Sequence, residues 1–139
     1  MFVKGVDIQA DICDLPIKND GYDIIICSMV LEHIPDDRKA MRELFRVLKP
    51  DGVAFVIVPL YEATFEDDSI IEPLEREKAF GQDDHVRRYG IDIVDRLKEA
   101  GFRVEGRNVK DELSDDERNR FSIGTGEGDT VFVCWKKEE

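Results

Sequence analysis

Two short apolar runs on either side of one amphipathic segment constrain the fold of this chain most strongly. Tyr22–Cys27 and Val53–Val58 are rich in isoleucine and valine, which predicts buried strands. Between them, from about Asp36, apolar residues recur at helical spacing, and Lys49–Gly52 ends the predicted helix. The apolar positions are Ala40, Met41, Leu44, Phe45 and Leu48. A strand, a helix and a strand in this order predict an open α/β sheet with parallel neighbours.

The rest of the chain continues the alternation. Val6–Ala10 predicts a short strand that ends at Asp11, and Tyr61–Gln82 is acidic and irregular, with a short helix at 73–80. A further amphipathic helix runs from Tyr89 to Ala100 and is capped by Gly101. The last predicted elements are a strand at 102–109, a helix opened by the capping box at 114–117, and a strand at 130–135. We expect the last two strands to be antiparallel neighbours at one edge.

Composition excludes several classes of function. The 139 residues correspond to one domain, and a net charge of −12 argues against binding to nucleic acid. The acidic runs Glu66–Asp68 and Asp111–Glu117 are predicted to be solvated. No apolar run is long enough for an export signal or a membrane span. The three cysteines follow no metal-ligand spacing, which predicts reduced thiols in the cytoplasm and no metal site.

Three segments carry a family pattern. Residues 10–17 read ADICDLPI, residues 21–34 read GYDIIICSMVLEHI and residues 41–52 read MRELFRVLKPDG. Together they resemble the later part of a class I S-adenosylmethionine (SAM)-dependent methyltransferase of the methyltransferase type 11 group. That group shows an acidic residue before LPF, a strand beginning FD, then VLEH, and a helix ending RVLKPGG. Ile17 and Asp51 replace the phenylalanine and the first glycine of this pattern.

The resemblance implies SAM as cofactor, bound outside the carboxyl ends of the strands. It implies that the Asp11 carboxylate accepts the adenine amino group and that the Ile12 amide meets a ring nitrogen. It also implies that Cys27, Ser28 and Met29 contact the methionine part. Methyl transfer depends on in-line positioning of the acceptor more than on acid–base groups, so the family supplies no fixed catalytic residue.

By the same resemblance, a complete domain begins with a strand, a glycine-rich turn, a helix and a strand ending in an acidic residue. Met1–Ala10 contains one glycine, Gly5, and Asp7 lies inside the predicted strand. We therefore expect a Rossmann-like methyltransferase sheet that is incomplete, without the family's first two strands and first helix, and with an antiparallel strand at its C-terminal edge. In the family order third, second, first, fourth, fifth, seventh, sixth, the gap falls in the middle. We expect either Val6–Ala10 beside Tyr22–Cys27, or a second copy or partner chain that completes the sheet.

Three further sites carry hypotheses. Gly124–Gly128 precedes a predicted strand and has no helix after it, so we predict a turn and not a substitute phosphate loop. His33, next to Glu32, is a candidate general base or a residue that shapes the loop. Phe80–Gly90 reads FGQDDHVRRYG, where His85, Arg87 and Tyr89 are candidates for an acceptor pocket. The alternative is an anchor for the next helix, with Asp83 and Asp84 paired to Arg87 and Arg88.

Two classes of function stay open for residues 1–139, which we expect to form a single partial methyltransferase domain. The first is a SAM-dependent enzyme that methylates a small-molecule acceptor, with the missing cofactor half supplied by another chain. The second is a non-catalytic methyltransferase-like domain with a structural or assembly role. A different Rossmann-type protein that uses NAD is a third reading, and the missing glycine turn counts equally against it.

Overall fold

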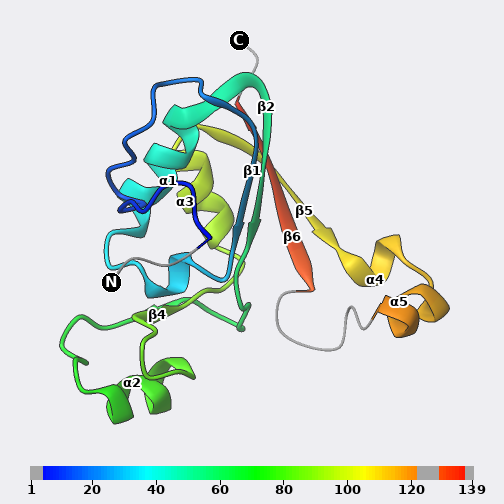
Figure 1. The fold of residues 1–139 in the computed structure, drawn as a ribbon. Coiled ribbons are helices and arrows are strands. Elements are labelled where there is room, and N and C mark those ends of the chain that lie inside the picture. Colours follow the sequence, from blue (N-terminus) through cyan, green and yellow to red (C-terminus); the bar gives the residue numbers. More distant parts are fainter. Residues whose placement is uncertain (1–4, 122–128, 137–139) are drawn as a thin grey trace.

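A four-stranded mixed sheet forms the centre of the computed structural model, which describes residues 5–121 and 129–136 (Figure 1). The strand order is β1–β2–β6–β5. β1 (Tyr22–Ser28) and β2 (Leu48–Ile57) are parallel. β6 (Thr130–Lys136) is antiparallel to β2 and also to β5 (Phe102–Asn108). This confirms the predicted Rossmann-like α/β sheet and its antiparallel C-terminal edge.

Two helices cover one face of the sheet. α1 (Asp37–Val47) crosses from β1 to β2, and α3 (Ile93–Glu99) precedes β5 (Figure 1). Their apolar faces and the inward side chains of β2 form the buried core, which includes Met41, Leu44, Leu97, Ala54 and Val56. The helical spacing read from the sequence therefore identifies the buried side of α1 correctly.

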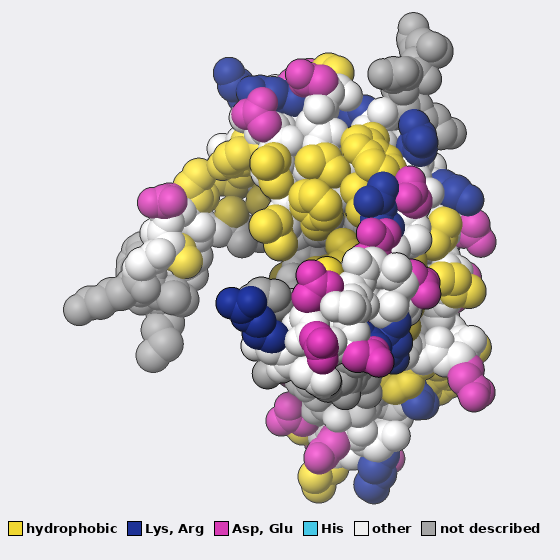
Figure 2. Space-filling model, turned by 90° about the vertical axis from the view of Figure 1, so that its right-hand side faces the viewer, with side chains coloured by type: hydrophobic (Ala, Val, Ile, Leu, Met, Phe, Trp, Pro, Cys, Tyr) yellow, Lys and Arg dark blue, Asp and Glu magenta, His cyan; other side chains and the backbone are white. Residues whose placement is uncertain are grey.

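The opposite face of the sheet is open and apolar. Ile24 and Ile26 of β1 are 60% and 73% exposed, and they are paired in register with Val53 and Phe55 of β2. Figure 2 shows hydrophobic side chains gathered over this side of the molecule. The short helices α4 (Val109–Glu112) and α5 (Asp115–Phe121) lie beyond the end of β5 (Figure 1), and α4 borders a pocket over this face together with Val53 and Phe55.

A smaller lobe follows β2. It holds the two-residue antiparallel strands β3 (Phe65–Glu66) and β4 (Arg87–Arg88), with α2 (Pro73–Phe80) between them in sequence (Figure 1). The 3₁₀ helix η1 (Leu31–His33) connects β1 to α1 and contacts β4. None of the helices that the structure describes has the length and apolar character needed to cross a membrane.

The predicted strand at Val6–Ala10 is wrong. No residue of this segment is in a strand, and Val6 and Ile8 are 53% and 51% exposed. A strand needs a partner for its backbone, and alternating apolar residues alone do not supply one. Within the described residues the outer edge of β1 is unpaired. The expectation that Val6–Ala10 pairs with β1 is therefore also wrong.

Other boundaries moved where tertiary contacts compete with local signals. The predicted turn Lys49–Gly52 lies inside β2, because a register shift between the pairs Tyr22–Leu48 and Ile24–Val53 absorbs the extra residues. α3 begins at Ile93 because Tyr89 forms a parallel bridge with Leu60. The capping box at 114–117 is confirmed, and Gly124–Gly128 lies outside the described residues.

Candidate functional site

The carboxyl ends of the two parallel strands are held together at one edge of the sheet. The amide of Met29 donates to the Ile57 carbonyl at 2.9 Å, and Met29 itself has a left-handed backbone with φ of 53°. Ser28 and Met29 are exposed, whereas Cys27 is buried. Burial, followed by the nearby negative charge of Glu32, raises the pKa of the Cys27 thiol to about 12. Cys27 is therefore a neutral core residue, and only its backbone is suited to a ligand contact.

Asp11 opens a tight turn beside the start of α1. Its Oδ1 accepts the amide N–H of Cys13 at 2.8 Å, and its carbonyl accepts the amide N–H of Asp14 at 3.0 Å. The thiol of Cys13 donates to the Asp36 carbonyl at 3.4 Å. Ile12 packs against the core, and the Asp11 side chain is exposed. The local turn role of Asp11 is thus present, and its adenine role stays a prediction.

Two residues of α1 fix the chain that follows this turn. Oε2 of Glu43 accepts the amide N–H of Leu15 at 2.8 Å, and Arg46 donates to the carbonyls of Leu15 and Ile17 at 2.9 and 2.6 Å. Glu43 and Arg46 also pair with each other, at 2.7 Å. The Arg46 hydrogen bond, supported by the Leu15 amide, lowers the pKa of Glu43 to about 2. The position of the Asp11 turn thus depends on a carboxylate that is ionised at neutral pH.

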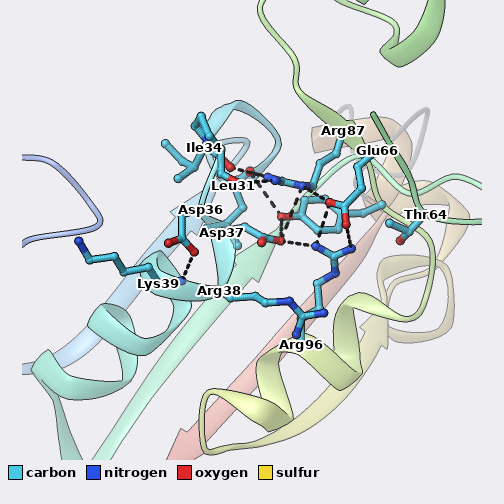
Figure 3. Close-up of polar contacts among 12 residues, drawn as sticks. Leu31, Ile34, Asp36, Asp37, Arg38, Lys39, Thr64, Glu66, Arg87 and Arg96 are labelled. Carbon is cyan, nitrogen blue, oxygen red and sulfur yellow. Dashed lines mark hydrogen bonds and ion pairs between the residues drawn. The ribbon is translucent and has the colours of Figure 1, made fainter. Parts of the chain in front are cut away.

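A buried ionic network connects η1, α1, the small lobe and α3 (Figure 3). Asp37, at the start of α1, accepts the Tyr89 hydroxyl at 2.6 Å and Nη1 of Arg96 at 2.9 Å. Nη2 of Arg96 donates to Glu66 at 2.9 Å, and Nε of Arg87 donates to the same carboxylate at 3.0 Å. The hydrogen bond from Arg96 holds the pKa of Glu66 below its ordinary value. Asp37, Glu66 and Arg96 gave no sequence signal, because an isolated charge on a helix or in an acidic run is usually solvated.

Arg87 and Tyr89 are members of this network. The Arg87 guanidinium is 4% exposed and donates to the carbonyls of Leu31 at 3.1 Å and Pro35 at 2.7 Å, and also to that of Ile34. The Tyr89 ring is fully buried, and burial together with the Asp37 charge raises the pKa of its hydroxyl. These contacts position η1, and the role of the two side chains in an acceptor pocket stays a prediction.

The other two candidates, His33 and His85, lie together. Their ring centroids are 4.6 Å apart in an edge-to-face arrangement. His33 is partly exposed and its Nδ1 is 3.4 Å from the Asp84 carboxylate, whereas His85 is buried. Among the described residues no ion pair joins Asp83 or Asp84 to an arginine, so the predicted pairing with Arg87 and Arg88 is wrong.

Comparison with known sequences gives related methyltransferases. Residues 3–56 match a family model described as a methyltransferase domain. The chain is 40% identical over 90 residues to the uncharacterized methyltransferase YcgJ of Bacillus subtilis, covering 64% of this chain and 34% of YcgJ. It is 34% identical over 100 residues to the chloroplastic 2-methyl-6-phytyl-1,4-hydroquinone methyltransferase 1 of rice, covering 63% of this chain and 30% of that protein. The chain thus spans about a third of the length of these curated relatives.

Solved structures show the same fold. The crystal structure of Bacillus subtilis YcgJ superposes with a TM-score of 0.60 at 22% identity, over 95% of this chain and 71% of that one. A SAM-dependent methyltransferase of Thermotoga maritima, described as a possible histamine N-methyltransferase, superposes with a TM-score of 0.60 at 23% identity, over 94% and 63%. The family motifs at residues 10–52, the mixed sheet and these matches agree. The chain therefore belongs to the class I SAM-dependent methyltransferases.

Proposed function

We propose that this chain carries part of the cofactor site and the acceptor side of an enzyme that transfers a methyl group from SAM to a small molecule. The observation that carries the proposal is the edge where β1 and β2 end together, with Ser28 and Met29 exposed. Ligands of open α/β sheets bind outside the carboxyl ends of parallel strands. The family uses SAM. That the acceptor is a small molecule is part of our proposal.

The residues at this edge fit one side of the cofactor. The exposed Asp11 carboxylate can accept the adenine amino group while its Oδ1 also holds the turn at Cys13. Ile12 follows Asp11 in the same turn, and Met29, with its left-handed backbone, is exposed where β1 ends. When bound, SAM supplies a methyl group on a sulfonium centre, which an acceptor attacks in line. The work of this chain is to bind and orient the two reactants and to exclude water between them.

The network under the site serves that orientation. Arg87 binds carbonyls within and just after η1, and Tyr89 and Arg96 bind Asp37 at the start of α1. Ser28, Met29 and η1 follow one another in the chain, so these contacts restrict the position of the strand end. A small displacement of a reacting group lowers the rate of transfer strongly. A rigid position for this loop, held by buried charged side chains, would therefore favour methyl transfer.

Calorimetric titration with S-adenosylhomocysteine tests the proposal. We expect saturable binding that Asp11→Ala weakens at least tenfold, whereas Asp51→Ala, which removes an exposed aspartate of β2, leaves it unchanged. A ligand with a dissociation constant near 1 mM, about −4 kcal/mol, still gives measurable heat. The absence of any binding heat at millimolar ligand would reject the enzyme assignment for this chain and favour a non-catalytic, structural role.

We also propose that the sheet is extended along β1 by a strand from outside the described residues. The unpaired β1 edge and the exposed Ile24 and Ile26 support this, because an apolar strand edge readily pairs with another strand. Sedimentation of the purified chain tests whether a second copy supplies the strand. A dimer that Ile26→Lys dissociates is the expected result, and a monomer at all concentrations would exclude self-pairing.

A further inference from the structure

Both histidines of the chain and a buried glutamate converge on one point, although they come from two distant segments. The chain has two histidines in total. One potential ligand atom each from Glu32, His33 and His85 lies within 4.8 Å of the others. Glu32 and His33 are consecutive on η1, and His85 lies in the loop before β4. The sequence predicted no metal site, because ligands so far apart form no recognisable spacing.

The Glu32 carboxylate lacks the partners that a buried charge requires. Its residue is 2% exposed, and Oε2 has no hydrogen-bond partner among the described residues. A buried carboxylate without a donor or a counter-charge is strongly disfavoured, because desolvation is not offset. A cation at this position supplies what the described side chains do not.

Each imidazole has an oxygen atom close to its Nδ1. Nδ1 of His33 faces the Asp84 carboxylate at 3.4 Å, and Nδ1 of His85 faces the Phe80 carbonyl at 3.4 Å. An oxygen beside Nδ1 favours the tautomer with the proton on Nδ1, which leaves Nε2 as a free electron pair. This arrangement, with an oxygen acceptor behind the ring, is the usual support for a metal-binding histidine.

We propose that Glu32, His33 and His85 bind a divalent transition-metal ion, with zinc as the test ion. Two imidazoles and one carboxylate form a common catalytic zinc set, in which the fourth position is open. At zinc–ligand distances near 2.1 Å, tetrahedral ligand atoms lie about 3.4 Å apart, so binding requires the three side chains to approach one another from their present spacing of up to 4.8 Å. The His33 side chain is 32% exposed, which leaves a path for the ion and for a fourth ligand from solvent.

Two hydrogen bonds to backbone carbonyls hold the two segments in place before any ion binds. The amide of Val86 donates to the Glu32 carbonyl at 2.9 Å, directly beside His85. Arg87 donates to the Leu31 carbonyl on the other side of Glu32. The ligands are therefore on a fixed frame, and binding requires little ordering of the chain.

Zinc titration of the tag-free, metal-free chain tests this site without SAM, so its result is independent of the proposed methyl transfer. We expect one zinc ion per chain, and at least tenfold weaker binding in His33→Ala, His85→Ala and Glu32→Gln. Asp83→Asn, which alters the exposed neighbour of Asp84, is the matched control and should bind like the parent. Circular dichroism of each metal-free variant verifies that it folds. Asp84→Asn leaves all three ligands intact and should therefore weaken zinc binding less than the loss of a ligand.

Cobalt replacement identifies the ligands independently. A tetrahedral nitrogen–oxygen site gives visible bands without a thiolate charge-transfer band, and Cys13→Ser should leave them unchanged. Zinc binding that survives both His85→Ala and Glu32→Gln, a thiolate band, or no binding at millimolar zinc would each overturn the site.

Discussion

The hydroxyl of Tyr89 donates a 2.6 Å hydrogen bond to Oδ2 of Asp37, and both side chains are buried. The contact joins the segment before α3 to the first turn of α1, far apart in the sequence. Arg96 binds the same oxygen at 2.9 Å, so the carboxylate is satisfied by a charged and a neutral donor. Because Asp37 also follows η1, this contact connects the interior to the candidate site.

Tyr89→Phe should destabilise the fold without changing its shape. A hydrogen bond to a charged group contributes about 1.5–3 kcal/mol, and Arg96 remains to hold Asp37 after the substitution. Urea unfolding measures the change in free energy. Tyr22→Phe, at an exposed tyrosine, should stay within about 0.5 kcal/mol of the parent. Equal effects of the two substitutions would contradict a specific role for the Tyr89–Asp37 contact.

Glu43 should give the stability of the chain a distinct dependence on acid. Its folded pKa of about 2 lies below the ordinary value of 4.5, so the folded state holds fewer protons between these values. The stabilisation is complete above about pH 4.5 and is lost as the pH falls toward 2. Urea midpoints at pH 7, 4.5 and 3 should fall less steeply with acid in Glu43→Gln than in the parent. Glu62→Gln, at an exposed glutamate, is the control, and a parallel fall in all three proteins would reject the assignment.

Gly101→Ala should destabilise the junction between α3 and β5. Gly101 has φ of +114°, and a Cβ there would lie 2.9 Å from the Phe45 ring. The backbone conformation alone costs an L-residue about 1–2 kcal/mol, before the ring has to move. Gly106→Ala is the matched control, because its Cβ would meet Phe132 at an ordinary 3.6 Å. Thermal unfolding of both variants checks the difference, and a Gly101→Ala protein as stable as the parent would contradict it.

Local signals were sufficient where one segment decides its own conformation. α2 was predicted at the bounds the structure gives, and Gly101 ends α3 as its lack of a Cβ predicts. The parallel pair β1 and β2 followed from apolar runs that flank an amphipathic helix. In each case the determinant lies within a few residues of the element.

The remaining features depend on contacts between distant segments. The acidic run Glu66–Asp68 is exposed as predicted, and Glu66 in addition pairs with Arg87 and Arg96, which the sequence did not indicate. Nothing local distinguishes Glu66 from its neighbours, because its partners arrive through the fold. For the same reason the sequence did not reveal that His33 and His85 meet, or that Asp84 turns to His33 and not to an arginine.

The meeting of Glu32 with the two histidines leads to a stability order that reverses with zinc. Without metal, Glu32→Gln replaces a buried carboxylate whose Oε2 has no hydrogen-bond partner among the described residues, so the variant should be at least as stable as the parent. With zinc at a hundredfold excess over its dissociation constant, the parent should gain about 2.7 kcal/mol and the variant much less. Thermal unfolding of both proteins, with chelator and with zinc, measures the four values. A variant that is less stable than the parent in chelator, or a parent that zinc does not stabilise, would contradict the proposed metal site. A stability order of the two proteins that reverses between chelator and zinc therefore distinguishes a metal ligand from an ordinary buried carboxylate.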